Sequence, residues 1–205
     1  KEGQTVYAET CPQYLLLDDS VYTKPNFQGA VYVCAPPIRK KEDQDCLWEA
    51  LSREDIQTVA TDQCSFTLAQ KALGKDDFTK IPGGLPGVQT RGTLLYTYGV
   101  KEGRITQEQM CKLLSENPAK LYGVYPQKGV LALGSDADIV VLDPEKESVI
   151  SAATHAYNTD NNPFEGFRLR CGIDKVFLRG KLAVDDGQLV KEKLGKYIAR
   201  GKKQM

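Results

Sequence analysis

Hydrophobic and polar residues follow two different patterns along this chain. Up to about Gly129, short β-branched runs alternate with longer stretches in which apolar residues recur at helical spacing. An alternation of strands and helices is typical of βα units, so this part predicts an α/β arrangement with parallel strands. From Gly129 onward, short apolar runs follow one another between glycine and aspartate turns, which predicts a small all-β region.

The pattern of the first part predicts particular elements. The expected strands lie at residues 5–9, 31–34 and 58–61, and the first expected helices at 42–53 and 91–98. Thr106 and Gln109 have the spacing of a capping box, which predicts the start of another helix. A short helix is expected after a cap at Asn117, with Pro118 at its first position and Gly123 just past its end.

In the second part, the expected elements are short strands and tight turns. The strands are predicted at residues 130–133, 138–142, 168–171, 175–178, 181–184 and 189–191. Asp186 and Gly187 form a strong hairpin-turn signal between two of these runs. The last residues, 195–205, are basic and thinly apolar, so we expect an extended arm or a disordered tail there.

Composition excludes several classes of function. The 205 residues are 41% apolar and 26% charged, and 27 basic residues balance 27 acidic ones, so bulk charge favours neither a nucleic acid nor an anionic membrane as a partner. No apolar run approaches the roughly 20 residues of a membrane span, and no signal-peptide pattern opens the chain. The six scattered cysteines favour reduced thiols in the cytoplasm over a secreted, disulfide-bonded protein. Because Lys1 replaces an initiator Met, we expect a piece of a longer protein.

Asp62 is the leading candidate for chemistry. It follows the predicted strand at 58–61, and a carboxylate at a strand end can ligate a metal ion or act as a general base. The alternative is a structural role as a helix N-cap or in an Asx turn. Glu9 ends the first predicted strand and has the same two interpretations, of which a structural partner is the more common.

Two stiff loops could present backbone groups to a ligand. The loop at residues 81–87 holds three glycines and two prolines, so its backbone can approach a planar polar substrate closely. It matches neither a phosphate loop nor the dinucleotide-binding fingerprint. The loop at 35–39 directly follows a predicted strand. Its Arg39 could pair with a carboxylate or a substrate, and a surface or structural ion pair is the default expectation.

His155 is the only histidine, and a structural role is expected for it. A catalytic zinc site commonly needs two or three histidine ligands, which this chain does not supply. Serine-histidine-aspartate catalysis is also unsupported, because the sequence holds no G-x-S-x-G elbow. The residues by themselves therefore predict an incomplete site.

Taken together and in order, the motifs of this chain resemble those of the dihydropyrimidinase and D-hydantoinase family. They are T-C-P-Q-Y-L (10–15), A-P-P-I-R (35–39), A-T-D-Q-C (60–64), Q-K-A (70–72), D-D-F-T-K-I-P-G-G (76–84), N-P-A-K-L (117–121), Y-P-Q-K-G (125–129), G-S-D-A-D-I-V (134–140) and N-P-F-E-G (162–166). The resemblance implies an α/β fold: the C-terminal part of an amidohydrolase (β/α)8 barrel at residues 1–128, the C-terminal strands of a small β-sandwich at 129–194, and a tail at 195–205.

The resemblance also implies an activity. Family members open cyclic amides such as 5,6-dihydrouracil and hydantoins, giving N-carbamoyl amino acids in pyrimidine catabolism. They use two divalent metal ions, usually zinc, bridged by a carbamylated lysine and a hydroxide, and they are often homotetramers. The implied partner is thus a small cyclic ureide or amide, with no nucleic acid and no membrane.

Three positions inherit expected roles from this resemblance. Asp62 falls on the last metal ligand, which also serves as the base that carries a proton to the leaving nitrogen. Gly83, where the family often has Asn, and Ala35, where it often has Ser, fall on main-chain contacts to the substrate ring. Gln63 replaces the His that commonly follows the ligand, although its side chain still offers hydrogen-bond donors and an acceptor.

Other readings of the resemblance stay open at this point. A non-catalytic scaffold relative would keep the fold but typically loses the aspartate at Asp62. Allantoinase and dihydroorotase are alternative activities, against which the motif at 76–84 favours a hydantoinase. The remaining metal ligands would lie upstream of Lys1, so we expect residues 1–205 alone to be inactive.

Overall fold

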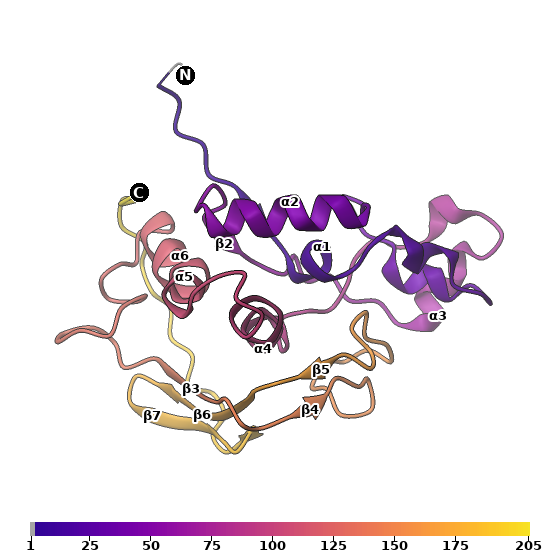
Figure 1. Cartoon of the computed structure of the whole chain (residues 1–205). Helices are drawn as coiled ribbons and strands as arrows, with labels where there is room; N and C mark the ends of the chain where they lie inside the picture. Colours follow the sequence, from indigo (N-terminus) through magenta and orange to yellow (C-terminus); the bar gives the residue numbers. More distant parts are fainter. Residues whose placement is uncertain (1–2) are drawn as a thin grey trace.

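The computed structural model describes residues 3–205 and places a helical layer over a β layer (Figure 1). In this view α2 (Lys41–Ser52) lies at the top, with α1 (Pro12–Leu16) below it. The strands of the second part lie at the bottom, and α4 (Arg91–Leu95) lies between the two layers. The chain is thus a mixed α/β protein, as predicted.

The prediction of a helix at 42–53 is confirmed by α2. Its buried face carries Trp48 and Leu51, which are 4% and 0% exposed. The Trp48 indole nitrogen donates a hydrogen bond to the Leu15 carbonyl at 3.0 Å, which fastens α2 to α1. Burying the large apolar side chains of α2 in this way supplies much of its stability.

The residues just before α1 and those that follow α2 form a short parallel pair of strands. β1 (Glu9–Thr10) pairs with β2 (Thr58–Val59), and Glu9 lies opposite Thr58. Both strands are shorter than predicted, because pairing extends over only two residues of each. The predicted strand at 31–34 is wrong. Residues Gln28–Tyr32 form a 3₁₀ helix, η2, and the Val33 carbonyl bonds to the loop at 81–87 rather than to a strand.

Three further helices follow in the predicted places. α4 continues as a π-helix, η5 (Tyr96–Val100), and α5 (Gln107–Cys111) continues through the π-helix η6 (Lys112–Glu116) into α6 (Asn117–Leu121). The predicted capping box is confirmed: Thr106 Oγ1 accepts from the Gln109 amide at 3.2 Å, and Gln109 Oε1 accepts from the Thr106 amide at 2.9 Å.

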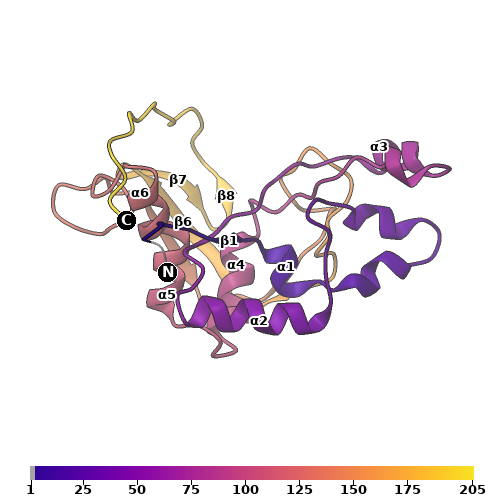
Figure 2. The same cartoon turned by 90° about the horizontal axis from the view of Figure 1, so that it is seen from above.

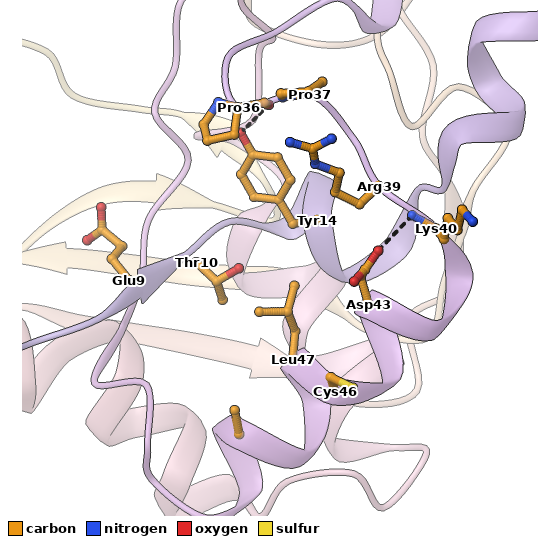
Figure 3. Close-up of a pocket in the computed structure, with 11 residues that line it drawn as sticks. Glu9, Thr10, Tyr14, Pro36, Pro37, Arg39, Lys40, Asp43, Cys46 and Leu47 are labelled. Carbon is orange, nitrogen blue, oxygen red and sulfur yellow. Dashed lines mark hydrogen bonds between the residues drawn. The ribbon is translucent and has the colours of Figure 1, made fainter.

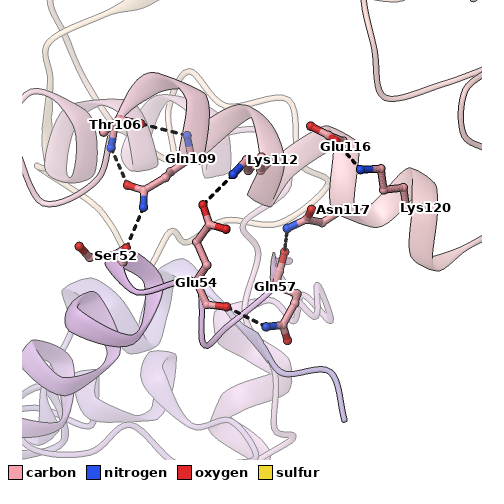
Figure 4. Close-up of polar contacts among 9 residues, drawn as sticks. All are labelled: Ser52, Glu54, Gln57, Thr106, Gln109, Lys112, Glu116, Asn117 and Lys120. Atoms are coloured by element: carbon pink, nitrogen blue, oxygen red, sulfur yellow. Dashed lines mark hydrogen bonds and ion pairs between the residues drawn. The ribbon is translucent and has the colours of Figure 1, made fainter. Parts of the chain in front are cut away.

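The predicted cap at Asn117 is wrong, because the helix runs through this residue without a break. Its side-chain amide instead donates to the Gln57 carbonyl at 2.8 Å (Figure 4). Lys112 donates to Glu54 at 2.7 Å, so the helix is joined to the segment between α2 and β2 at two points. The end of α6 is as predicted, with Gly123 at φ +69° directly after the last turn.

The loop region after β2 contains three short helical turns, α3 (Leu68–Lys71), η3 (Ala72–Gly74) and η4 (Phe78–Lys80). A further short turn, η1 (Asp19–Thr23), follows α1. A capping box formed by Thr67 and Gln70 begins α3, with Thr67 Oγ1 accepting from the Gln70 amide at 3.2 Å. This cap fixes the direction in which the side chain of Lys71 leaves the helix.

The β layer consists of an antiparallel sheet and a separate strand pair. The sheet has the order β3 (Ile139–Asp143), β6 (Gly172–Leu178), β7 (Lys181–Asp185) and β8 (Gln188–Leu189), and the pair is β4 (Ser148–Val149) with β5 (Arg168–Leu169). The predicted hairpin turn is confirmed, because Asp186 and Gly187 have φ angles of +47° and +74°.

One predicted strand of this part is wrong. Residues 130–133 form no strand among the described residues, and Leu131 and Leu133 are 77% and 107% exposed. Because a strand needs a hydrogen-bonding partner, the apolar character of this run was insufficient to make one.

Apolar side chains of α4 connect the two layers. Leu95 packs with Trp48 and Leu51 of the helical layer and with Cys171 of the β layer, which is 0% exposed. Its neighbour Leu94 belongs to a second cluster, with Phe164 and other residues. The two adjacent leucines of α4 therefore pack into two different apolar clusters.

The last residues cross back to the helical layer in an extended conformation (Figure 2). The Gly201 amide donates to the Gly123 carbonyl at 2.6 Å, and the Gln204 amide donates to the Lys120 carbonyl at 3.0 Å. The predicted extended arm is thus present, and it lies against the end of α6. In residues 3–205, no helix combines the length and apolar character needed to cross a membrane.

Candidate active site

Asp62 lies three residues past β2 in a left-handed backbone conformation, with φ +47°. Aspartate tolerates this conformation better than most residues. The side chain is exposed, and within residues 3–205 its carboxylate makes no hydrogen bond or ion pair. The structural alternative is therefore not found: α3 is capped by Thr67, and Asp62 closes no Asx turn among the described residues.

The glycine-rich loop is fastened to the residues that follow Asp62. Gln63 forms a parallel bridge with Leu85, and the Cys64 amide donates to the Leu85 carbonyl at 3.1 Å. The Gln63 side-chain oxygen accepts from the amides of Gly87 at 3.1 Å and Val88 at 2.9 Å. The loop thus has a fixed register relative to the end of β2.

Two adjacent glycines in this loop have different surroundings. A Cβ on Gly84 would lie 2.2 Å from the Cys64 carbonyl oxygen, and its φ of +147° is a glycine conformation. A Cβ on Gly83 would be 3.8 Å from the Cys34 Cα, an ordinary contact. Gly84 therefore allows the close packing of the loop, while Gly83 is exposed beside the loop that holds Ala35, which is also exposed.

Lys71 connects the glycine-rich loop to the residues just before the loop that holds Ala35. It is only 2% exposed, and its ammonium donates to the carbonyls of Val33 at 2.9 Å, Pro82 at 2.7 Å and Gly84 at 3.1 Å. Burial lowers the pKa of Lys71 to about 8, and the nearby sulfur atoms of Cys34 and Cys64 oppose that shift. An ammonium group is thus buried among backbone oxygens.

The negative charge of Asp62 raises the pKa of two nearby thiols, those of the buried Cys11 and the half-buried Cys34. Burial raises the pKa of Cys11 to about 12, and the carboxylates of Glu9 and Asp62 raise it further. Burial also raises the pKa of Cys34; the Tyr14 hydroxyl and the Lys71 ammonium oppose the rise, while Asp62 adds to it. The Asp62 carboxylate therefore acts on Cys11, just after β1, and on Cys34, just before Ala35.

A cavity of about 550 Å³ is lined by residues of α1, of the loop at 35–39 and of α2 (Figure 3). Glu9, Tyr14 and Arg39 are among the residues that line it, whereas Asp62, Ala35 and Gly83 are not. Glu9 accepts a hydrogen bond from the Thr58 hydroxyl at 2.9 Å, which agrees with its expected role as a structural partner of β2. The described residues therefore do not bring all sequence candidates into one cavity.

The donor atoms present fit one ligand position of a metal site. No group of three or more His, Cys, Asp or Glu residues in the described part of the chain is arranged to hold a metal ion. Asp62 offers an uncommitted carboxylate, the hard donor that divalent cations accept. Residues 3–205 thus supply a single candidate ligand.

The sequence alone does not predict the contacts of two residues of the site. Gln63 replaces a His of the family, and its side-chain oxygen accepts from two loop amides. Lys71 lies within a family motif, but nothing in its sequence neighbourhood predicts its burial. His155, by contrast, bonds to the Thr159 carbonyl at 2.9 Å within its own loop, in agreement with a structural role.

A comparison with family models matches residues 18–183 to the amidohydrolase family. That match covers most of the chain, and the chain belongs to the amidohydrolase family.

Particular relatives within the family are hydantoinases. The chain is 49% identical over 203 residues to a D-hydantoinase of Geobacillus stearothermophilus. This alignment covers 98% of this chain and 43% of that protein. It is 46% identical over 186 residues to a D-hydantoinase of Streptomyces coelicolor, covering 90% of this chain and 40% of that protein. The crystal structure of dihydropyrimidinase from Brevibacillus agri NCHU1002 matches with a TM-score of 0.89 and 48% identity, over 90% of this chain and 40% of the other. The chain therefore spans about two fifths of the length of these relatives.

Proposed function

We propose that the whole protein that carries this chain hydrolyses the C–N bond of cyclic amides. Its substrates would be dihydropyrimidines or hydantoins, and its products N-carbamoyl amino acids. The observation that carries this proposal is the free carboxylate of Asp62 at the end of β2, beside a loop fixed by Gln63. The names of the similar proteins, D-hydantoinase and dihydropyrimidinase, support the same reaction class.

The fold is proposed to be part of a larger one. Residues 1–128 would be the last βα units of a (β/α)8 barrel, 129–194 a portion of a β-sandwich, and 195–205 a tail. The parallel pairing of β1 with β2 and the antiparallel sheet β3-β6-β7-β8 are compatible with this division. We further propose a cytoplasmic homotetramer.

Asp62 would hold a divalent metal ion, together with residues outside this chain. Two such ions, proposed to be zinc, would supply activation of water and polarisation of the amide carbonyl. A carboxylate is suited to this role because its oxygen atoms bind such cations at typical protein sites. The exposed, uncommitted side chain of Asp62 supports the assignment.

The residues of this chain would then orient the ring and move one proton. The Asp62 carboxylate accepts the proton of the attacking water and delivers it to the ring nitrogen as the C–N bond breaks. The backbone amide and carbonyl groups at Gly83 and Ala35 bind the polar edge of the ring. Neither contact needs a side chain, so the small residues at these two positions are compatible with the role.

An enzyme is favoured over the scaffold alternative by the presence of Asp62. A scaffold relative would typically lack this aspartate, whereas here it is present, in a left-handed conformation with an exposed side chain. Allantoinase and dihydroorotase are less favoured, because the similar proteins are hydantoinases and a dihydropyrimidinase.

The test compares Asp62→Asn with the wild type in the whole protein. Asp186→Asn is the matched control, because Asp186 has the same φ of +47° but lies in the β7–β8 turn. We expect Asp62→Asn to lower turnover of 5,6-dihydrouracil or hydantoin by about 10²–10⁴-fold, the usual contribution of a general base. Asp186→Asn should keep wild-type turnover. Wild-type turnover in Asp62→Asn would contradict the assigned role, and a wild type that opens neither ring would contradict the proposed function.

A further inference from the structure

Lys71 is a buried cation that the proposed reaction does not use. Its side chain is among the largest fully buried ones, and it leaves the end of α3 toward the glycine-rich loop. No ion pair of Lys71 is found within residues 3–205. Its three ammonium protons instead satisfy the three backbone carbonyls of Val33, Pro82 and Gly84.

Burying an unpaired ammonium group is costly. A charge taken out of water is stable in a protein only when hydrogen bonds replace its hydration, and an apolar side chain of similar size fills such a space without that cost. The lowered pKa of Lys71 reflects the same penalty. The benefit that offsets this cost must therefore lie in the backbone positions that the three hydrogen bonds fix.

Two of the three carbonyls belong to the glycine-rich loop, and the third lies just before the loop at 35–39. Pro82 and Gly84 flank Gly83 on both sides, so two of the bonds fix the backbone around it. Val33 lies two residues before Ala35, and its carbonyl accepts both from Lys71 and from the Gly84 amide at 2.9 Å. One ammonium group thus links the backbone on both sides of Gly83 to the backbone just before Ala35.

We propose that Lys71 is a positioning residue that holds the backbone of Ala35 and Gly83 in the arrangement that binds the substrate ring. This inference rests on the proposed function. Lys71 touches neither the substrate nor the reacting atoms, and it acts through the two loops. Because the ring contacts it sets are made in the ground state and the transition state alike, their loss raises KM and leaves kcat nearly unchanged.

The experiment measures kcat and KM of the whole, metal-loaded protein with 5,6-dihydrouracil or hydantoin. Lys71→Met removes all three donors at similar volume. Lys80→Met is the matched control, because Lys80 lies in the same segment but is exposed, and its one ion pair within residues 3–205 is with Asp77, at 3.6 Å. We expect Lys71→Met to raise KM at least about tenfold, equivalent to the loss of about 1.4 kcal/mol of binding, with kcat changed less than about threefold and an unchanged metal content. Lys80→Met should match the wild type.

Several results would overturn the inference. A purely structural role would reduce the amount of folded enzyme, so the apparent kcat of Lys71→Met would fall while KM stays at the wild-type value. If Lys71→Met does not fold, Lys71→Gln carries the test, because its shorter, uncharged side chain has two N–H protons and leaves at least one of the three carbonyls without a donor; an unchanged KM there rejects the inference. A wild type without activity on either ring would instead reject the proposed function, so the two failures are distinguishable.

Discussion

Replacing Gly84 by alanine tests whether the loop packing is as tight as the structure shows. The added Cβ would lie 2.2 Å from the Cys64 carbonyl oxygen and 2.7 Å from the Cys64 Cβ, well inside normal contact distances. The φ of +147° is also unfavourable for any residue with a side chain. Either the loop moves or the protein carries the strain.

The loss of stability can be estimated for each of these two outcomes. Strain at such a backbone angle costs about 1–3 kcal/mol, and overpacking costs about 1–3 kcal/mol more, so a loop that stays in place loses roughly 4 kcal/mol. A loop that moves gives up the Gly84–Val33 and Cys64–Leu85 hydrogen bonds, at about 1 kcal/mol each. We therefore expect a loss of about 2–4 kcal/mol, a large share of the roughly 5–15 kcal/mol that stabilises a typical domain.

The assay is urea unfolding of the whole protein, followed by circular dichroism. Gly83→Ala is the matched control for stability, because it makes the same change one residue away, where the nearest atom is 3.8 Å distant. Its unfolding free energy should stay within about 1 kcal/mol of the wild type. Equal unfolding midpoints for Gly84→Ala and Gly83→Ala would refute the packing of this loop against Cys64.

Two further predictions concern the same loops. Because burial lowers the pKa of Lys71 to about 8 from 10.5, the folded protein binds fewer protons than the unfolded chain between these values. The unfolding free energy of the wild type relative to Lys71→Met should therefore rise from pH 8 to 10.5 by up to roughly 3 kcal/mol, and parallel stability curves for the two proteins over this range would contradict the shift. Replacing Gln63 by leucine leaves the amides of Gly87 and Val88 without their acceptor, so we expect about 1–2 kcal/mol of lost stability and faster hydrogen exchange at both amides. Unchanged exchange there would show that Gln63 does not hold the loop.

Helix positions were largely readable from the sequence. The helix α2 and the capping box at Thr106 depend on local spacing and on hydrogen bonds between residues close in the chain, so a single sequence contains their signal. The hairpin turn at Asp186 and Gly187 is local in the same sense. These predictions succeeded because their causes lie within a few residues.

Strands and buried polar groups were less predictable. The runs at 31–34 and 130–133 have strand-like composition, but a strand also requires a partner, which the local pattern does not contain. The hydrogen bonds of Lys71 go to carbonyls 11, 13 and 38 residues away in sequence. The position of Asp62 after a β-branched run makes it a candidate, whereas the exposure of its carboxylate is visible only in the fold.

The central claim is that Asp62 is a metal ligand of a cyclic amidohydrolase. It is tested most directly by anomalous diffraction at the zinc absorption edge, from crystals of the whole, metal-loaded protein. We predict an anomalous peak in bonding contact with the Asp62 carboxylate, and its loss or strong reduction in crystals of Asp62→Asn. A fully occupied metal site elsewhere, with no peak at Asp62 in the wild type, would contradict the account.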